Sequence, residues 1–248
     1  MKKYIVLVSV LIIVSFVACN NSNKSQDKKS PVELITSNKS EVIEPSDLCF
    51  SYDKNALWTV SDETNSAYLI SFEGKILKTI KLEGKDPEGI TVIDDTTFAV
   101  VFERQRIFAK YSTSGKELLR KTFEEFTGEL NAGFEGLTYN PTNGHFFIVN
   151  EKDPRLFIEL DGDLNIIKKK ELTFASDYSG VFYDSINDCL WLISDESKLI
   201  AKCDFDGNVL DSFNVSVPQM EGIAVDFNTK RIYAISDITW ELFVYKIL

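Results

Sequence analysis

Three short stretches of the sequence place a carboxylate directly before a glycine, at the start of an alternating run of apolar residues. They read DPEGITV at 86–92, GFEGLTY at 133–139 and QMEGIAV at 219–225. Carboxylates that converge on one point repel one another, so they need protons, basic partners, backbone donors or a cation. Oxygen-only ligands suit a hard cation such as calcium, which takes about 6–8 of them. These stretches indicate a cation site, provided that the fold brings the glutamates together.

The three stretches belong to a longer repeat that predicts how they are positioned. Five similar segments, spaced roughly 42 to 47 residues apart, begin at Pro45, Pro87, Phe134, Tyr178 and Met220. Each contains four short runs of strand-forming residues separated by polar or glycine-containing turns. About 40 residues with four strands is the period of a propeller blade. We expect an all-β fold, a β-propeller of four-stranded blades, with five blades favoured and six as the alternative.

The last repeat ends at Leu248, after its third run, so it lacks a fourth strand. The segment 32–43 precedes the first complete repeat and has no other place in the pattern. We expect it to close the ring as the outer strand of the last blade, which would protect the edges of an open sheet. Residues 32–248 would then form a single β-propeller domain.

A propeller gathers equivalent positions of all blades around one axis, so aligning the repeats predicts two rings of side chains. The first ring contains Ser46 or Asp47, Glu88, Glu135, Ser179 and Glu221. The second follows the second strand of each blade and is acidic throughout: Asp62, Glu103, Glu151, Asp195 and Asp237. For both rings two interpretations stay open. Glu88, Glu135 and Glu221 would hold a cation in the channel, or the acids would accept hydrogen bonds from backbone N–H groups of the next blade.

Basic residues follow the second-ring acid in blades two and three. The candidates for binding an anion are Arg106 and Arg155, because a guanidinium matches the geometry of carboxylate or phosphate. The alternative is that these bases form salt bridges to Glu103 and Glu151.

The N-terminal residues predict a targeting signal. A basic start is followed by an uncharged apolar run at 4–17, which is short for a membrane span, and then by Ala18 and Cys19. This pattern resembles a bacterial lipobox. It predicts a lipoprotein signal peptide at 1–18, lipidation of Cys19 and a flexible tether at 19–31; an ordinary secreted protein is the alternative. The expected location is the bacterial cell envelope, anchored by lipid with the outer membrane favoured, and facing the periplasm or the exterior.

Composition excludes one class of partner. The formal net charge of −11 argues against nucleic acid, which needs a basic surface. The other three cysteines are too few for a disulfide scaffold. Cys189 and Cys203 would lie roughly opposite each other on one hairpin, so either a cross-strand disulfide or buried thiols would fit there.

The ordered motifs FEGLTYNPTNGHFFIVNEKDPR, SGVFYDSINDCLWLISDESKLIAKCDFDGNVL and MEGIAVDFNTKRIYAISD resemble the SdiA-regulated (YjiK-like) family of bacterial envelope proteins. The similarity extends over Pro45–Leu248. It implies a β-propeller, attachment to the envelope and a relationship to phytase-like propellers, and it implies no settled activity.

Three hypotheses for function follow. In the first, the protein is a lipid-anchored binding or scaffold module for an envelope protein or a small ligand, with calcium in the central channel. The alternative is a calcium-dependent hydrolase of phosphate esters or lactones, in which the cation polarises the substrate and activates water while Arg106 and Arg155 hold an anion. The third is an envelope protein with no small-molecule site. Propellers serve all three purposes, so the fold cannot decide between them.

Overall fold

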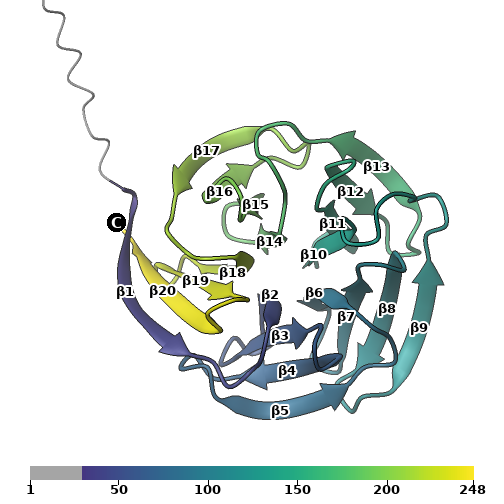
Figure 1. The fold of residues 1–248 in the computed structure, drawn as a ribbon, viewed down its shortest axis with the longest axis horizontal. Helices are drawn as coiled ribbons and strands as arrows, with labels where there is room; N and C mark the ends of the chain where they lie inside the picture. The colour runs from purple at the N-terminus through teal and green to yellow at the C-terminus, as the bar shows by residue number, and fades with distance from the viewer. Residues whose placement is uncertain (1–29) are drawn as a thin grey trace, which may run out of the picture.

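A computed structural model of the protein describes residues 30–248 and contains twenty strands in five four-stranded antiparallel sheets. The sheets stand around a central axis as the blades of a propeller (Figure 1). This confirms the predicted fold class and the blade count of five. The predicted signal peptide, Cys19 and most of the tether lie outside the described residues. Within residues 30–248 no helix has the length and hydropathy needed to cross a membrane.

The first four blades run from the axis outward in chain order. The strands of blade one are β2 (Pro45–Phe50), β3 (Leu57–Ser61), β4 (Ser66–Ile70) and β5 (Ile76–Lys81). Those of blade two are β6 (Pro87–Val92), β7 (Thr97–Phe102), β8 (Ile107–Ser112) and β9 (Glu117–Thr122). Those of blade three are β10 (Phe134–Asn140), β11 (His145–Asn150), β12 (Leu156–Leu160) and β13 (Ile166–Glu171). Those of blade four are β14 (Gly180–Asp184), β15 (Cys189–Ser194), β16 (Leu199–Cys203) and β17 (Val209–Asn214).

The fifth blade joins the two ends of the described chain. It contains β18 (Met220–Asp226), β19 (Arg231–Ser236) and β20 (Glu241–Ile247), and its outer strand is β1 (Val32–Lys39). β1 pairs antiparallel with β20, with Val32 opposite Ile247 and Lys39 opposite Glu241. The predicted closure by an N-terminal strand is confirmed, and Figure 1 shows it where the purple and yellow ends meet.

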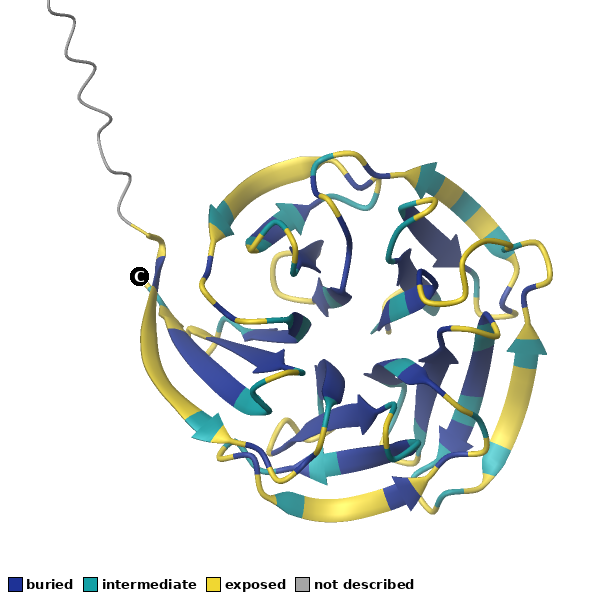
Figure 2. Cartoon of the chain, in the orientation of Figure 1, coloured by how far each residue is buried: buried dark blue, intermediate teal, exposed yellow. Residues whose placement is uncertain are grey.

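Burial falls from the axis outward (Figure 2). The second strand β15 is buried along its whole length, whereas the outer strand β13 alternates between exposed and partly buried residues. Five apolar clusters fill the spaces between neighbouring blades. A strand packed on both faces carries a continuous apolar run, which explains the pattern of the second runs in the repeat.

The innermost strands approach so closely that the repeated glycine has no room for a side chain. A Cβ on Gly89 would lie 2.9 Å from the backbone of Glu135, and one on Gly136 would lie 2.6 Å from Cα of Gly180. Strand pairing shifts register just before this glycine in blades two, three and five, as in a β-bulge. The glycine is therefore required by close packing, and the bulge turns the preceding glutamate toward the axis.

Blade one has Asp47 at the position of this glycine. Its backbone φ is +53°, and a Cβ on Gly222 of blade five would lie 2.6 Å from its Cα. The buried Asp47 carboxylate accepts hydrogen bonds from the backbone N–H groups of Leu48 (2.8 Å), Ile90 (2.8 Å) and Leu137 (3.2 Å). One side chain thus ties together the inner strands of blades one, two and three.

The cysteines in the described chain are unpaired. Cys49, Cys189 and Cys203 are all buried free thiols. Cys203 lies opposite Leu190, one position away from Cys189, so the two sulfurs pack into different apolar clusters. The interpretation as buried thiols is confirmed. The disulfide alternative was wrong because a one-residue difference in register puts the two side chains on opposite faces of the sheet.

Asp47→Ala is expected to destabilise the propeller, because it leaves the buried N–H groups of Ile90 and Leu137 without acceptors. Each unsatisfied buried group costs about 1–3 kcal/mol, so the expected total loss in unfolding free energy is about 2–6 kcal/mol. Asp47→Asn keeps one oxygen acceptor and should lose less. Urea unfolding measures both values; equal losses in the two variants would contradict the role of the carboxylate.

Candidate functional site

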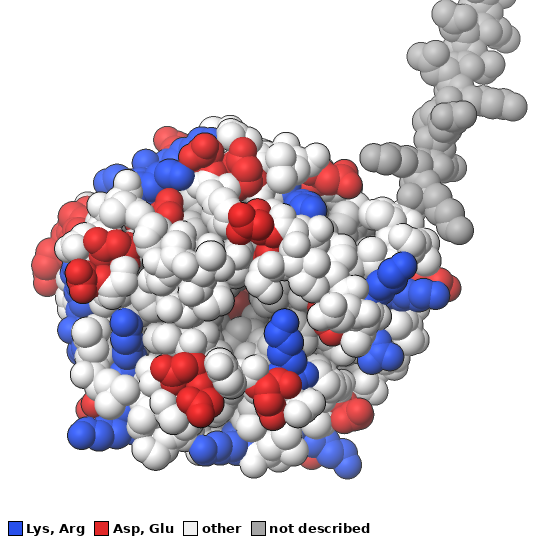
Figure 3. Space-filling model, turned by 180° about the vertical axis from the view of Figure 1, so that it is seen from behind, with Lys and Arg blue, Asp and Glu red and all other residues white. Residues whose placement is uncertain are grey.

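An acidic cavity occupies the end of the axis where the inner strands begin. Its volume is about 400 Å³, and all five blades contribute to its walls. Two basic residues, Arg104 and Lys152, line it together with eleven acids: Asp62, Asp86, Glu88, Glu103, Glu135, Glu151, Asp177, Asp195, Glu196, Glu221 and Asp237. On the face shown in Figure 3, acidic and basic side chains are interspersed around a central hollow.

The first predicted ring lines this cavity through Ser46, Glu88, Glu135, Ser179 and Glu221. In blade one the ring position is Ser46 and not Asp47, because the Asp47 carboxylate joins the inner strands and does not line the cavity. The Ser46 side chain hydrogen-bonds to Glu88, and the Ser179 hydroxyl donates to the backbone carbonyl of Met220. The ring thus consists of three carboxyls and two hydroxyls.

All five acids of the second ring also line the cavity, each one residue after the second strand of its blade. Glu103 accepts a hydrogen bond from the N–H of Gly133, and Asp195 accepts one from the N–H of Met220, both at 3.1 Å. Both donors belong to the next blade: Gly133 directly precedes its inner strand β10, and Met220 is the first residue of its inner strand β18. The backbone-acceptor interpretation therefore holds for two of the five acids.

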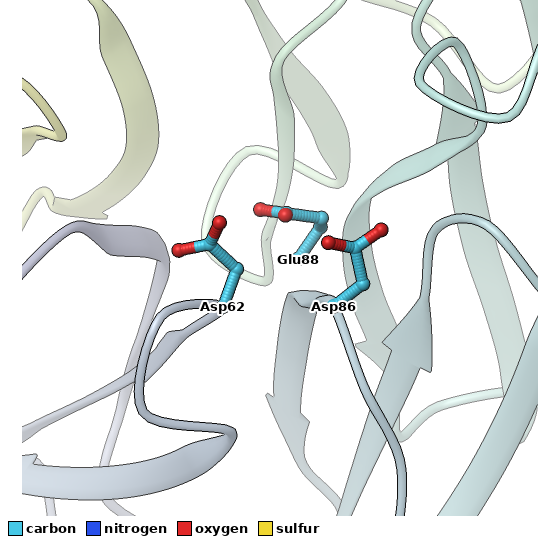
Figure 4. A group of neighbouring side chains, drawn as sticks. All are labelled: Asp62, Asp86 and Glu88. Atoms are coloured by element: carbon cyan, nitrogen blue, oxygen red, sulfur yellow. The ribbon is translucent and has the colours of Figure 1, made fainter.

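Two groups of three acids bring carboxylate oxygens close enough to share one ion. The oxygens of Asp62, Asp86 and Glu88 all lie within 4.8 Å of one another, and Figure 4 shows these three side chains pointing toward a common space. The second group, with the same limit, contains Glu103, Glu135 and Glu151.

These two groups of acids differ from the three glutamates that the aligned repeats predicted to share a cation. Glu88 and Glu135 fall into different groups, and Glu221 is in neither. Each group combines one glutamate of the first ring with acids from its own blade and from the blade before it in the chain.

Sequence reasoning missed Asp86 and Asp177. Both lie two residues before the first-ring position, where the repeats read Glu44, Asp86, Gly133, Asp177 and Gln219. Aligning this position as well would have found a third partly acidic ring. Asp86 Oδ2 lies 2.8 Å from Nε of Arg104, and the Asp177 carboxylate accepts a hydrogen bond from the Ser194 hydroxyl.

Burial and mutual repulsion raise the pKa values of several carboxyls of the cavity. The pKa values of Glu88, Glu135 and Glu221 are raised well above the usual range, first by burial; for Glu135 the charges of Glu88 and Glu221 come next. The pKa of Glu103 is raised to about 7 and that of Asp237 to about 6, in both cases mainly by burial. The metal-free cavity therefore binds protons at a pH where exposed carboxyls have lost theirs.

The two arginines predicted to bind an anion donate hydrogen bonds to backbone carbonyls. The buried guanidinium of Arg106 donates hydrogen bonds to the carbonyls of Glu103, Leu130 and Glu129, and Arg155 donates to the carbonyl of Ala175. Neither residue lines the acidic cavity. The bases that do are Arg104, which contacts Asp86, and Lys152, which lies 2.6 Å from Glu151.

Comparison with known proteins identifies the family and the fold. The family model described as SdiA-regulated matches residues 26–244. The glutaminyl cyclase of Myxococcus xanthus is similar in structure, with a TM-score of 0.68 at 15% identity over 87% of this chain and 95% of the cyclase chain. A chain of a nidogen/laminin complex has a TM-score of 0.57 at 13% identity over 79% of this chain and 77% of its own.

A third similar structure is the virginiamycin B lyase of Staphylococcus aureus, with a TM-score of 0.52 at 14% identity. The match covers 82% of this chain but only 66% of the lyase chain. At these identities the similarity shows a shared propeller fold and carries no activity over to this chain, since propellers include both enzymes and binding proteins.

Without metal, the protein is expected to lose stability as the pH rises from about 5 to about 7.5. The folded state keeps the protons of Glu103 and Asp237 to a higher pH than the unfolded chain does, so these groups stabilise the fold at low pH and stop doing so as the pH passes their raised pKa values. After allowance for solvent screening, Glu103 should account for about 1–2 kcal/mol. Glu103→Gln should flatten this dependence, measured by urea unfolding with chelator across the same pH range; an unchanged slope would contradict the assignment.

Proposed function

Because this chain belongs to the SdiA-regulated family, we propose from its own geometry that it is a cell-envelope binding propeller whose central cavity holds calcium. The observation that carries the proposal is the concentration of eleven acids against two bases in one cavity. Two ionised carboxylates about 4.8 Å apart repel by about 3 kcal/mol at an effective dielectric constant near 20. A bound cation replaces this repulsion by attraction.

The donor set favours calcium among the common metals. Every candidate ligand in the two groups is a carboxylate oxygen, and neither histidine nor cysteine lines the cavity. Zinc prefers nitrogen and sulfur, and magnesium demands a strict octahedron, whereas calcium accepts 6–8 oxygens in flexible geometry. Water would supply the remaining ligands, since the cavity is open to solvent and large enough to contain it.

We place the protein at the membrane through a lipid on Cys19, with residues 19–31 as the tether. The support is the order of basic, apolar and small residues before Cys19, which matches a lipoprotein signal. Residues 20–31 would separate the propeller from the membrane, so the cavity would stay accessible to a ligand in the envelope.

Cys19→Ser is expected to move the protein from the membrane fraction to the aqueous fraction of fractionated cells. If the wild type and the variant both stay in the membrane fraction, the lipid anchor is wrong.

Excess calcium is expected to raise the melting temperature of the metal-free protein. A ligand that binds only the folded state stabilises it by about 2.7 kcal/mol at 100 times its dissociation constant, which corresponds to roughly 5–10 °C for a chain of this size. Glu135→Gln removes one ligand of the second group and should shrink the shift substantially. Differential scanning calorimetry at fixed pH measures both.

Glu171→Gln is the matched control, because Glu171 is an exposed acid at the end of β13 and the substitution changes the charge by the same amount. It should leave the calcium shift unchanged. The proposal fails if millimolar calcium has no effect on the wild type, or if Glu171→Gln and Glu135→Gln reduce the shift equally.

One observation favours a hydrolase as a second candidate. The pKa of Glu103, at about 7, suits a general acid or base, and this residue belongs to one of the two groups that would hold a cation. Calcium-loaded protein would be offered phosphate esters and lactones. If the wild type hydrolyses either substrate class and Glu103→Gln still binds calcium but has lost this turnover, the hydrolase is favoured. If the wild type hydrolyses neither class, the binding function is the only candidate that remains.

A further inference from the structure

A second pocket lies at the opposite end of the inner strands. Its volume is about 230 Å³, and it is lined by the last residues of the inner strands and the turns that follow them, with contributions from all five blades. Its walls carry more apolar than polar surface, in contrast with the acidic cavity. The two cavities share no lining residue, so what binds in one need not affect the other.

Phe182 shapes the interior of this pocket. The equivalent residues in the other blades are smaller: Cys49, Thr91, Thr138 and Ala224. Phe182 belongs to blade four, yet its ring meets that of Phe50 in blade one edge to face, with centroids 6.0 Å apart. Because these two blades are not neighbours in the ring, Phe182 reaches across the axis.

Aromatic rings dominate the walls. Phe50, Tyr139 and Phe182 line the pocket and are only partly buried, and Tyr52 at the rim is 65% exposed. Apolar rings left in contact with water inside a concave site favour the binding of another apolar surface by roughly 25 cal/mol per Å². A ring placed there can also meet Phe50 and Tyr139 in the edge or offset arrangements that aromatic groups prefer.

Besides the tyrosines, seven lining residues carry polar side chains, and these groups differ in their availability: Ser51, Lys54, Thr91, Thr138, Asp184, Ser185 and Asp226. The carboxylates of Asp184 and Asp226 are engaged by donors of their own turns, among them Ile186 N–H and Asn228 N–H at 2.9 Å. Thr91 also lines the pocket and is only 4% exposed. Within residues 30–248, no other protein group forms a hydrogen bond with its hydroxyl. Its hydroxyl is thus free to bond with an occupant.

We propose that this pocket binds a small aromatic molecule with one ring and a hydrogen-bonding oxygen, the ring lying among Phe50, Tyr139 and Phe182 and the oxygen meeting the Thr91 hydroxyl. The volume fits one substituted ring and is too small for most drug-sized ligands, whose sites start at about 300 Å³. An apolar cavity with a few convergent polar groups is the usual form of a small-molecule site.

The test uses p-cresol and toluene, which differ by one hydroxyl. Affinities would be measured by NMR titration of the protein without calcium and with calcium. The wild type should bind p-cresol more tightly than toluene. Thr91→Val keeps the shape of the side chain and removes its hydroxyl, so it should weaken p-cresol binding about fivefold to tenfold and leave toluene binding unchanged.

A second variant tests the location. Val92→Phe places a larger side chain at a lining position and should abolish binding of both compounds, with a melting curve to show that the protein is folded. Thr79→Val on the exposed outer strand β5 is the control and should bind as the wild type does. Benzoate and choline extend the comparison to an anion and to a quaternary ammonium ion.

The proposal is overturned if p-cresol does not bind, if Thr91→Val weakens toluene and p-cresol equally, or if folded Val92→Phe binds both compounds as before. Tighter binding of choline than of p-cresol would also overturn it, because the rings would then act as a cage for a cation. Calcium is expected to leave all these affinities unchanged. A result that overturns the aromatic pocket therefore does not overturn the calcium site, and the reverse also holds.

Discussion

The close approach of five inner strands to one axis is the constraint on which the rest of the structure depends. Backbone meets backbone there, so only glycine fits at Gly89, Gly136 and Gly222, and a bulge before it turns the preceding residue into the channel. Glutamate at that position becomes part of a ring. The acidic cavity is thus a consequence of how the blades pack, repeated with small changes from blade to blade.

The departures from the repeat determine how the two ends of the channel differ. Asp47 stands where other blades have glycine and uses its carboxylate to tie three inner strands together. Phe182 stands where other blades have smaller residues and contacts Phe50 across the axis. The cavity near the start of the inner strands is lined mainly by charged residues, whereas the pocket at their other end has more apolar than polar surface.

Electrostatics in the acidic cavity couples proton binding, cation binding and stability. The carboxyls are buried and close together, which raises their pKa values, and the same proximity would make them good ligands once deprotonated. Protons and calcium would therefore compete for the same oxygens, so the affinity for the metal should rise with pH. Arg104 and Lys152 offset only a small part of the negative charge, and Arg106, which lies outside the cavity, interacts electrostatically with Glu103 and Glu135.

The sequence alone favoured five blades, identified the closing strand and found the two rings of positions that line the cavity, because a propeller converts equal positions in a repeat into neighbours around an axis. It could not determine which acids share an ion. Glu88 and Glu135 are equivalent in the repeat, yet they join different groups through Asp86 and Glu151. Nor could it separate Cys189 from Cys203, or show that Phe182 reaches Phe50. Those outcomes depend on register and on distances of a few ångströms between blades, which only the packed tertiary structure decides.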